Sequence, residues 1–564
     1  MRLTFAVLAD SHFHPPGPPA QAAWASDVWF NQRNAAAVAM VGRADLAFVV
    51  HLGDVVHPVP GLAAHADALG VARETYLPLR MPLYVVPGNH DVGDKPHPWA
   101  PAPSVSPEKH TTFRSWWGAP WWVVERDGVR LIGIDTPVLN SGLALEAEQW
   151  AWLEGVLVPG VRTFVFLHYP PFLLDPEEPE HYDNLAEPAR SRLLALFSAA
   201  GVEAVFCGHV HHPFWNHHAG VDYYLLPSTA FVRPGYSELG RVGPGEEYGR
   251  NDVHRLGFCL VHVDEAGHRV EWVRTNGVTE APAPPAGQGP GEVRPRCPLG
   301  LTLRHAWDAI LDIPADGLDP FRRKQARNDL VLLATWELGV DLFRLPIEDL
   351  RRPATRARLA ALGRWGHRVV LYTADALTDA DVALIVAHQG LLAGVEFILP
   401  RAWLDRPLPA LPVPRWMAPF GRHATDDGKY FNHFAPHGFT LDDPDLRRSV
   451  GDVLLFRVDP GIDPREAVPR AVEAARVVGK RAAALVLLPR GGEGTLLDDD
   501  AAVTERALAA LDAALGNPGV PVLLDTTVDH DRGYFPRLGL LDRRGNPRPA
   551  FTALAARARE ITRS

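Results

Sequence analysis

Residues 83–91 read LYVVPGNHD, an apolar run that ends in a glycine and three polar side chains. A short run rich in valine, leucine and tyrosine favours a buried strand. The Pro-Gly pair ends the run, so that Asn89, His90 and Asp91 fall directly after the strand. Loops at the carboxyl ends of strands are where α/β proteins gather ligand-binding groups. The stretch therefore predicts an α/β unit with a functional site at a strand end.

The same pattern recurs along the first half of the chain. Four further apolar runs end in polar or histidine residues, namely LTFAVLADSH (3–12), LAFVVHLGD (46–54), TFVFLHY (163–169) and EAVFCGHVHH (203–212). Between the runs, apolar residues recur every three or four positions, which predicts helices. The predicted helices are 27–43, 63–76, 145–157 and 188–200. Strands and helices in alternation predict a layered α/β fold.

The strand ends carry nitrogen and oxygen donors in five blocks. In chain order the blocks are D-x-H at 10–12, G-D at 53–54, G-N-H-D at 88–91, a histidine at 168 and G-H-x-H at 208–211. A dinuclear site for displacement at phosphorus needs such donors and one carboxylate that bridges two cations ~3.5–4 Å apart. The five blocks supply both.

In this order and spacing the blocks resemble those of the calcineurin-like metallophosphoesterases, over about residues 1–275. The D-x-H opening is also similar to that of class III cyclic nucleotide phosphodiesterases and glycerophosphodiesterases. The resemblance implies a four-layer αββα sandwich. It also implies a dinuclear metal-dependent phosphoesterase that hydrolyses a phosphodiester, or a phosphomonoester, by attack of a metal-bridging hydroxide. Donors of this kind accept Mn, Fe, Zn or Co.

The resemblance implies seven metal ligands, of which Asp54 would bridge the two ions. The other six would be Asp10, His12 and His211 for one ion and Asn89, His168 and His209 for the other. His90 would stabilise charge on the phosphoryl oxygens and protonate the leaving oxygen. Asp91 is expected to orient the His90 imidazole.

His57 stands three residues after Asp54. Purple acid phosphatases place a metal-ligating tyrosine at this position, and protein serine/threonine phosphatases place an aspartate there. Together with the D-x-H opening, His57 disfavours both branches and favours phosphodiesters over monoesters. The sequence leaves two roles open for His57, a contact with the site or substrate and a partly exposed loop position.

Residues 280–296, EAPAPPAGQGPGEVRPR, have almost nothing to bury and predict a linker between domains 1–279 and 297–564. The second domain restarts the alternation with eight apolar runs, which predict a (β/α)8 barrel. The runs begin at residues 301, 341, 367, 394, 415, 452, 482 and 521. A helix is predicted over residues 319–338.

The closing stretch 537–551, RLGLLDRRGNPRPAF, resembles the end of glycoside hydrolase barrels over about twenty residues. Glu396 falls inside the fourth barrel strand and Glu493 beyond the seventh, so the pattern gives no acid and nucleophile pair. The barrel is therefore predicted to be an accessory or substrate-recognition domain. The alternative is a carbohydrate-active or carbohydrate-binding barrel with an auxiliary phosphoesterase domain.

A rim for recognition is expected at the carboxyl ends of the barrel strands. Its candidate residues are Arg344, Asp427, Asp531 and Arg532. Since all seven implied ligands precede the linker, a chain truncated after Thr279 is expected to keep its metal and to hydrolyse a small phosphodiester.

The composition bounds the partners of the 564-residue chain. With 56 Lys and Arg against 67 Asp and Glu, the net charge of -11 argues against nucleic-acid polymers and anionic membranes. No apolar stretch approaches the ~20 residues of a membrane span. The three cysteines, Cys207, Cys259 and Cys297, are too few for a disulfide framework. We expect a cytoplasmic protein that acts on a small-molecule phosphate ester.

Overall fold

The computed structural model describes most of the chain in two compact units. Unit 1 comprises residues 1–292 and 310–329, and unit 2 comprises 293–309 and 330–564. The predicted domains, 1–279 and 297–564, are each continuous in sequence, whereas unit 1 also contains residues 310–329. Residues 283–295 of the predicted linker lie outside the described part of the chain. The described residues are 3–17, 22–97, 103–237, 239, 242–243, 245–282, 296–304, 306–313, 324–420, 437–488, 499–529 and 538–561.

Unit 1 is built around two sheets, counted over its described residues. The first has five strands, in the order β11 (His268–Arg274), β10 (Gly257–Val263), β1 (Leu3–Leu8), β2 (Val49–His51) and β3 (Leu83–Val85). The second has six, in the order β4 (Trp122–Arg126), β5 (Val129–Ile134), β6 (Thr163–Leu167), β7 (Ala204–Cys207), β9 (Val221–Leu225) and β8 (Phe214–His218). The predicted mixed α/β fold is confirmed.

The two sheets pack face to face because alternate residues of each strand point to opposite faces. Phe5 on β1 stacks edge-on against Phe164 and Phe166 on β6, with ring centroids 6.0 and 5.9 Å apart. Its neighbour Ala6 belongs instead to an apolar cluster that includes Val41 of the first helix. Each sheet thus buries one face against the other sheet and its opposite face against helices.

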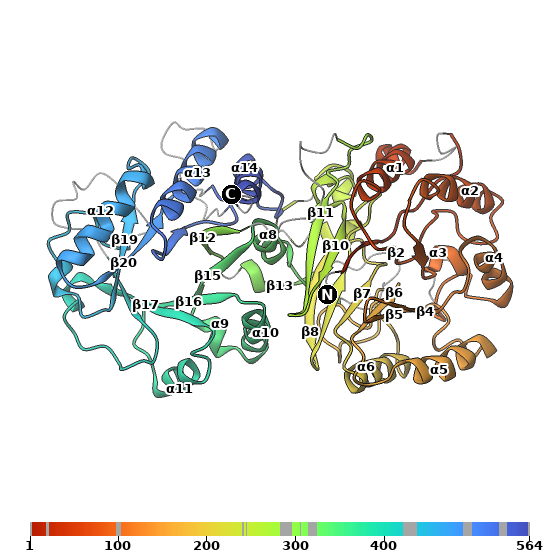
Figure 1. Cartoon of the computed structure of the whole chain (residues 1–564), viewed down its shortest axis with the longest axis horizontal. Helices are drawn as coiled ribbons and strands as arrows, with labels where there is room; N and C mark the ends of the chain where they lie inside the picture. Colours follow the sequence, from red (N-terminus) through yellow and green to blue (C-terminus); the bar gives the residue numbers. More distant parts are fainter. Residues whose placement is uncertain are drawn as a thin grey trace. The chain divides into compact units, whose positions relative to one another are not determined.

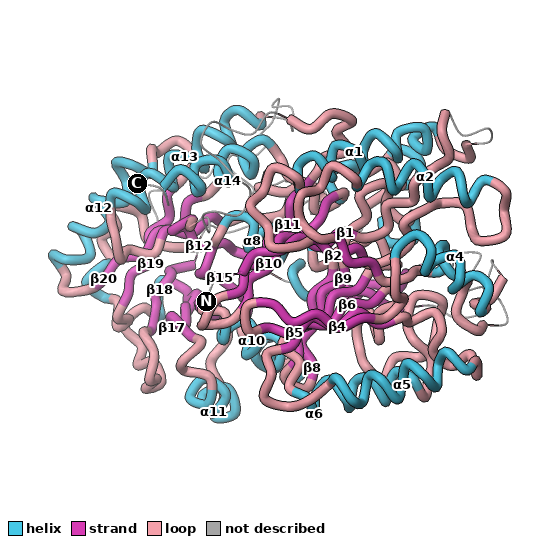
Figure 2. Tube along the Cα trace, turned by 45° about the vertical axis from the view of Figure 1, so that its right-hand side comes forward, coloured by secondary structure: helices cyan, strands magenta, loops and turns pink. Residues whose placement is uncertain are grey.

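Helices cover the outer faces of both sheets, and Figure 2 shows α1 and α2 on one side of the strands and α5 and α6 on the other. These four correspond to the four predicted helices. Their bounds are α1 Phe30–Val41, α2 Ala64–Tyr76, α5 Ala144–Val156 and α6 Ala189–Ala200. The other α-helices of unit 1 among the described residues are α3 (Asn89–Val92), α4 (Pro107–Trp117) and α7 (Pro234–Ser237), and a 3-10 turn, η1 (Ala25–Trp29), precedes α1.

Unit 2 is a closed barrel of eight parallel strands within the described residues (Figure 1). The strands are β12 (Cys297–Thr302), β15 (Val340–Pro346), β16 (Arg368–Thr373), β17 (Leu392–Pro400), β18 (Arg415–Phe420), β19 (Val453–Val458), β20 (Arg481–Val486) and β21 (Val522–Leu524). Each of the eight predicted runs forms one strand, so the predicted barrel is confirmed.

The described helices of unit 2 follow most of these strands. They are α8 (Leu330–Leu338), α9 (Glu348–Arg351), α10 (Pro353–Arg364), α11 (Asp379–Ala387), α12 (Pro464–Val477), α13 (Asp500–Gly516) and α14 (Pro549–Ile561). A capping box marks the start of helix α11. The Thr378 hydroxyl accepts from the Asp381 amide at 3.2 Å, and the Asp381 carboxylate accepts from the Thr378 amide at 2.9 Å.

The helix predicted over 319–338 is wrong at 324–327, and its first five residues lie outside the described part. Residues Lys324–Arg327 form strand β14, which pairs antiparallel with β13 (Ile310–Ile313), and only Leu330–Leu338 is helical. This hairpin belongs to unit 1, where Ile313 and Ala326 join the apolar cluster of the second sheet. Burial of these side chains outweighs the high helix propensity of the Lys-Gln-Ala-Arg sequence.

Cys207, Cys259 and Cys297 are buried free thiols. Among the helices of the described residues, none combines the length and apolar character needed to cross a membrane.

Candidate metal centre

Tight turns after three strands of unit 1 place the predicted ligands. Five of the seven have left-handed backbone conformations, with φ between 46° and 69°. These five are Asp10, His12, Asp54, His209 and His211. Side chains other than glycine seldom adopt this conformation, and such strain concentrates at functional sites. The turns aim side chains from β1, β2 and β7 into one space.

Two motif glycines allow these turns to approach one another. A Cβ on Gly88 would lie 2.3 Å from the backbone nitrogen and from Oδ1 of Asp54, and a Cβ on Gly53 would lie 2.4 Å from the Gly88 nitrogen. Gly53 also has φ near 90°, a conformation natural to glycine. The glycines of the G-D and G-N-H-D blocks are therefore required by the contact between the loops after β2 and β3.

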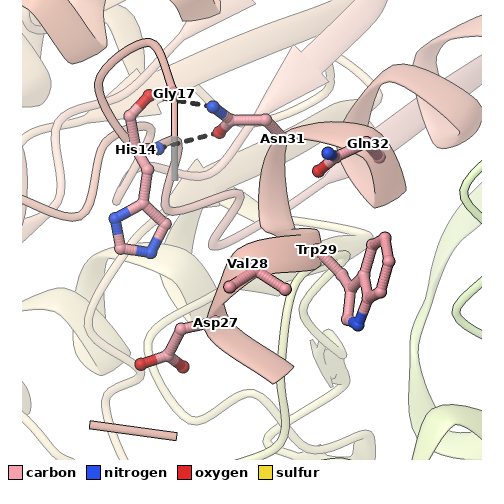
Figure 3. Close-up of a pocket in the computed structure, with 7 residues that line it drawn as sticks. All are labelled: His14, Gly17, Asp27, Val28, Trp29, Asn31 and Gln32. Carbon is pink, nitrogen blue, oxygen red and sulfur yellow. Dashed lines mark hydrogen bonds between the residues drawn. The ribbon is translucent and has the colours of Figure 1, made fainter. Parts of the chain in front are cut away.

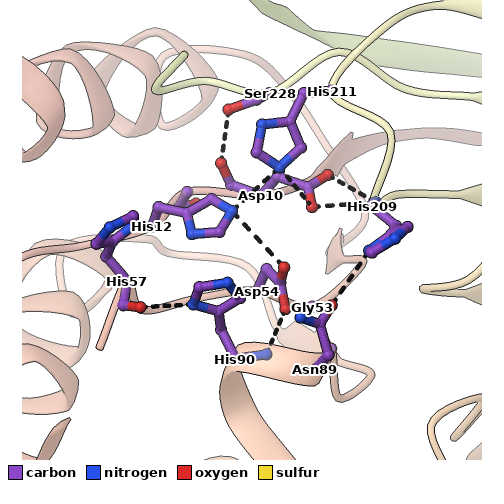
Figure 4. Close-up of polar contacts among 12 residues, drawn as sticks. Asp10, His12, Gly53, Asp54, His57, Asn89, His90, His209, His211 and Ser228 are labelled. Atoms are coloured by element: carbon purple, nitrogen blue, oxygen red, sulfur yellow. Dashed lines mark hydrogen bonds and ion pairs between the residues drawn. The ribbon is translucent and has the colours of Figure 1, made fainter. Parts of the chain in front are cut away.

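The first cluster contains Asp10, His12 and His211 together with Asp54 (Figure 4). The Nε2 atoms of His12 and His211 lie 3.1 Å apart, and the latter is 3.3 Å from Asp10 Oδ1. All four side chains are at most 3% exposed. The donor atoms predicted for one ion thus converge in a buried space.

The second cluster contains Asn89, His168 and His209. Asn89 Oδ1 lies 3.0 Å from His168 Nε2 and 3.1 Å from His209 Nδ1. The same two histidine nitrogens are 3.2 Å apart. The donor atoms predicted for the second ion also converge.

Asp54 faces both clusters with different oxygens. Its Oδ2 lies 3.6 Å from His12 Nε2, and its Oδ1 lies 3.4 Å from His168 Nε2. The structure therefore brings the seven predicted side chains together in the two predicted groups, with Asp54 between them. That they bind metal ions stays a prediction.

The donor set fits cations, because hydrogen bonds at the far ring nitrogens fix the histidine tautomers. His168 Nδ1 donates to the Leu52 carbonyl at 2.8 Å, and His211 Nδ1 donates to the Phe231 carbonyl at 3.2 Å. In the neutral rings Nε2 then carries a lone pair directed at the clusters. Such lone pairs, converging from imidazole, amide and carboxylate groups, suit a cation held between them.

Electrostatics point the same way. Burial alone would lower the pKa of His168, but the carboxylates of Asp54 and Asp10 outweigh it and raise the pKa to about 9. Burial, with His90 and His211 nearby, holds the pKa of His12 well below its usual range. The pocket thus favours positive charge beside Asp54 while keeping His12 neutral, the form that binds a metal ion.

Asp91 does not orient the His90 imidazole, which corrects the prediction. Its carboxylate accepts from the amides of Gly88 at 2.9 Å and Val55 at 3.1 Å, and so ties the two glycine loops together. His90 Nδ1 donates instead to the His57 carbonyl. Both His90 and Asp91 lie on the short helix α3, where neighbouring residues point in different directions.

His57 lies in the site and is half-buried. Its ring centroid is 5.4 Å from that of His12 and 5.6 Å from that of His90. Of the two roles that the sequence left open, this placement favours contact with the site.

Sequence reasoning missed Asp183, a fully buried carboxylate beside His209. Asp183 Oδ1 lies 3.4 Å from His209 Nε2, the ring nitrogen that points away from the cluster. Burial alone would raise the pKa of Asp183, but Arg233 and Lys324 hold the pKa well below its usual range. Asp183 follows no strand and belongs to no motif, so the sequence carries no signal for it.

In the barrel, Arg344 and Glu396 are both buried and form a two-pronged ion pair, with Nε–Oε2 at 2.6 Å and Nη2–Oε1 at 2.7 Å. Glu396 is therefore committed to a cation within its own unit. The remaining candidates named for the barrel lie outside the described residues, namely Asp427, Glu493, Asp531 and Arg532.

Residues 3–213 match the family model described as calcineurin-like phosphoesterase. Over 186 residues the chain is 32% identical to the serine/threonine-protein phosphatase CPPED1 of Danio rerio, covering 31% of this chain and 57% of that protein. Over 159 residues it is 30% identical to a probable glycerophosphodiester phosphodiesterase GpdQ of Arcobacter nitrofigilis, covering 26% of this chain and 52% of that protein. The match thus spans little more than half the length of these relatives.

A solved structure of GAP50, the anchor in the inner membrane complex of Plasmodium, is similar at a TM-score of 0.34 and 16% identity. The aligned part covers 49% of this chain and 85% of the GAP50 chain. The N-terminal part of the chain is thus similar to calcineurin-like phosphoesterases, among them a phosphatase and a probable phosphodiesterase.

Proposed function

We propose that unit 1 is a dinuclear metal-dependent phosphoesterase that prefers phosphodiesters. The observation that carries the proposal is the position of Asp54, whose two oxygens face two separate clusters of buried donors. A carboxylate shared in this way suits two cations held close together. The match of residues 3–213 to the calcineurin-like phosphoesterases supports the same reaction class.

Residues of both clusters would hold the ions, and imidazole with carboxylate and amide oxygen suits Mn, Fe, Zn or Co. When bound, two such cations lower the pKa of a water molecule and neutralise charge on phosphoryl oxygens. The His209 amide donates to Asp10 at 3.0 Å and the His90 amide donates to Asp54 at 2.7 Å, so the backbone fixes both carboxylates in place. This preorganisation keeps the donors in position before substrate arrives.

His90 would supply the proton to the leaving oxygen. Its Nδ1–H is committed to the His57 carbonyl, which leaves Nε2 as the atom that can face substrate. Its ring centroid lies 4.6 Å from that of His12, at the edge of the first cluster. A histidine held in this way can act as a general acid without being a metal ligand.

A pocket of about 390 Å³ supports the preference for phosphodiesters, because it offers room for a second ester substituent (Figure 3). Its lining residue His14 lies near the candidate metal centre, since the centroid of the His14 ring is 4.7 Å from that of His57, which in turn is 5.6 Å from that of His90. The ester substituent that stays on phosphorus would extend toward this pocket. A phosphomonoester, which has one substituent fewer, uses less of the available surface.

The pocket walls suit a polar organic group. Trp29 is 46% exposed and offers an apolar face, while Gln32 adds an exposed amide. Asn31 is committed to the loop, accepting from the His14 amide at 2.8 Å and donating to the His14 carbonyl at 3.0 Å. Trp29 and Gln32 are therefore the side chains expected to contact substrate.

We assign the barrel an accessory or substrate-recognition role. The commitment of Glu396 to Arg344 argues against glycosidase chemistry at this position, because its two oxygens are both bonded to the guanidinium and are not free to exchange a proton or to attack a sugar.

The test of the proposed function uses the full chain, stripped of metal by a chelator and reloaded with Mn²⁺ or Zn²⁺. We expect two ions bound per chain and metal-dependent hydrolysis of bis(p-nitrophenyl) phosphate. Absence of hydrolysis with both metals bound would contradict the proposal.

The diester preference has its own test. The kcat/KM for bis(p-nitrophenyl) phosphate should exceed that for p-nitrophenyl phosphate, and Trp29→Ala should raise KM for the diester more than for the monoester. Trp403→Ala, at a similarly exposed tryptophan of unit 2, is the matched control. Equal effects of Trp29→Ala on the two substrates would remove the pocket from substrate binding.

A further inference from the structure

The β13–β14 hairpin brings a lysine into the interior of unit 1. Lys324 is 4% exposed, and its side chain carries the ammonium group into contact with Asp183, which is fully buried. The Nζ–Oδ2 distance is 2.5 Å. Lysine is among the residues that are almost never buried unless they are paired, so this contact is a specific feature of the hairpin.

Further contacts anchor the hairpin beside β8, the last strand in the order of the second sheet. Arg327 donates to the Trp215 carbonyl at 2.8 Å and to Asn216 Oδ1 at 2.7 Å. The Trp215 amide donates to Asp329 Oδ2 at 2.9 Å. With Ile313 in the apolar cluster, these bonds fix the position of Lys324 from both strands and from the residues that follow β14.

Asp183 connects this lysine to the candidate metal centre. Its Oδ2 accepts from Lys324 Nζ and from the Tyr236 hydroxyl at 2.7 Å, and its Oδ1 accepts from Arg233. The same Oδ1 lies 3.4 Å from His209 Nε2. Asp183 thus stands between two cations of the protein and the outer nitrogen of a predicted ligand.

We propose that Lys324 is a positioning residue of the phosphoesterase site, which acts through Asp183 to hold the His209 ring with Nδ1 directed at the second cluster. The inference rests on the proposed function for the role of His209 as a ligand. It adds that a segment which follows the predicted linker in sequence completes the metal site.

The chemistry of His209 makes such support necessary. His168 and His211 face the clusters with Nε2, and backbone carbonyls accept from their Nδ1 atoms. His209 is reversed: Nδ1 faces Asn89 at 3.1 Å, and Nε2 faces Asp183. The negative charge of a carboxylate near Nε2 favours the tautomer protonated there, which leaves Nδ1 free to bind a cation. A buried carboxylate in turn needs nearby cations to remain ionised.

The expectation that a chain truncated after Thr279 keeps its metal is revised by this arrangement. Such a chain lacks Lys324 as well as the apolar side chains of the hairpin, among them Ile313 and Ala326. The truncated unit would expose part of its second-sheet cluster and leave Asp183 with fewer partners.

The test compares full-length wild type, Lys324→Met and Lys324→Arg by Co²⁺ titration of metal-free protein, followed by visible absorption. Wild type should show two binding steps. Lys324→Met should weaken one step by about tenfold, at the low end of the 10- to 100-fold effect of such outer contacts, and leave the other step unchanged. Lys324→Arg, which keeps the charge, should restore part of the loss. Gln325→Met, at the exposed neighbour on β14, is the matched control.

A second pair of variants tests the route through Asp183. In an Asp183→Asn background, Lys324→Met should have no further effect on the weakened step, because the group through which it acts is gone. Equal weakening of both steps would indicate a general structural role, and an unchanged titration would indicate no role; both overturn the inference. Wild type that binds no Co²⁺ would instead overturn the proposed function.

Discussion

Both units bury a group of polar side chains, but the two groups differ in how their charges are balanced. In unit 1, donors with lone pairs face one another around Asp54, and the nearest ring nitrogens lie 3.1 Å apart. In unit 2, Arg344 and Glu396 meet through two short hydrogen bonds of 2.6 and 2.7 Å. The first group offers donors for a cation from outside the chain, and the second has a cation of its own.

This difference separates a candidate site from a structural contact more sharply than burial does, since both groups are buried. A buried ion pair that is fully bonded needs no ligand, although it adds little net stability. Backbone conformation separates them as well. The candidate metal centre draws on five left-handed non-glycine residues, whereas Arg344 and Glu396 lie within regular strands β15 and β17. Strain at the first group indicates that its geometry serves function.

The largest effect is expected from Asp54→Asn. The substitution keeps the shape of the side chain and removes the charge shared by the two clusters. Metal analysis should find less than half of the wild-type content, and kcat/KM should fall by about 10⁴-fold, because each cation supplies several kcal/mol of charge stabilisation. Asp67→Asn, on the exposed face of α2, is the control and should change neither quantity. Full metal content in Asp54→Asn would show that the clusters of unit 1 do not depend on the charge of Asp54, and would contradict the comparison with unit 2.

His90→Ala should have a smaller effect of a different kind. The His90 backbone amide, which donates to Asp54, is retained, so both metals should remain bound. Loss of the acid should lower kcat by about 10²- to 10³-fold. A substrate with a better leaving group should be affected less, because it needs less help from a proton. Loss of metal together with unchanged turnover per metal-loaded chain would show that His90 is a ligand.

Much of the fold and of the candidate site could be predicted from sequence because local signals coincide with tertiary ones. Apolar runs mark the strands, and the residues that follow them, from Asp10 to His211, come together because parallel strands end at one edge. Gly53 and Gly88 are a further local signal of the site, because a side chain at either position would prevent the close contact of the two loops.

What could not be predicted depends on contacts between distant segments. Lys324–Arg327 are all good helix formers, and burial of the hairpin, with Ala326 in the apolar cluster and Lys324 beside Asp183, makes them a strand. Asp183 lies in the connection between β6 and α6, where no periodicity applies. The error for Asp91 has another cause: adjacency in sequence suggested contact with His90, but consecutive residues of a helical turn do not face each other.

In the barrel, Glu396→Gln should reduce stability without touching the metal chemistry. It leaves Arg344 buried with one charged partner fewer, a change that costs about 3–5 kcal/mol in comparable cases. Calorimetry should show a lower transition temperature, while Co²⁺ binding and phosphodiester hydrolysis at low temperature remain as in wild type. The double substitution Arg344→Met with Glu396→Leu should recover much of the stability, since it removes both charges. A loss of hydrolysis in the folded single variant would assign the pair a role in the reaction.

The smallest effect is expected at Asp349, a carboxyl whose burial outweighs the nearby Arg352 and favours the protonated form. It accepts from Trp307 Nε1 at 2.8 Å, and burial, with Asp308 nearby, raises its pKa to about 7. Its folded-state pKa therefore exceeds the ordinary value of 3.8, so the folded protein retains a proton that the unfolded chain releases between about pH 4 and pH 7. Stability from this group is full below pH 4 and is lost as the pH rises through 7.

Asp349→Asn cannot ionise and can still accept from Trp307. Its transition temperature should match wild type near pH 4 and exceed it at pH 8, by the equivalent of at least ~1.4 kcal/mol, which is the value of one pKa unit. A difference between the two proteins that does not vary from pH 4 to pH 8 would show that Asp349 is ionised throughout this range, and that this part of the barrel balances its charge in another way.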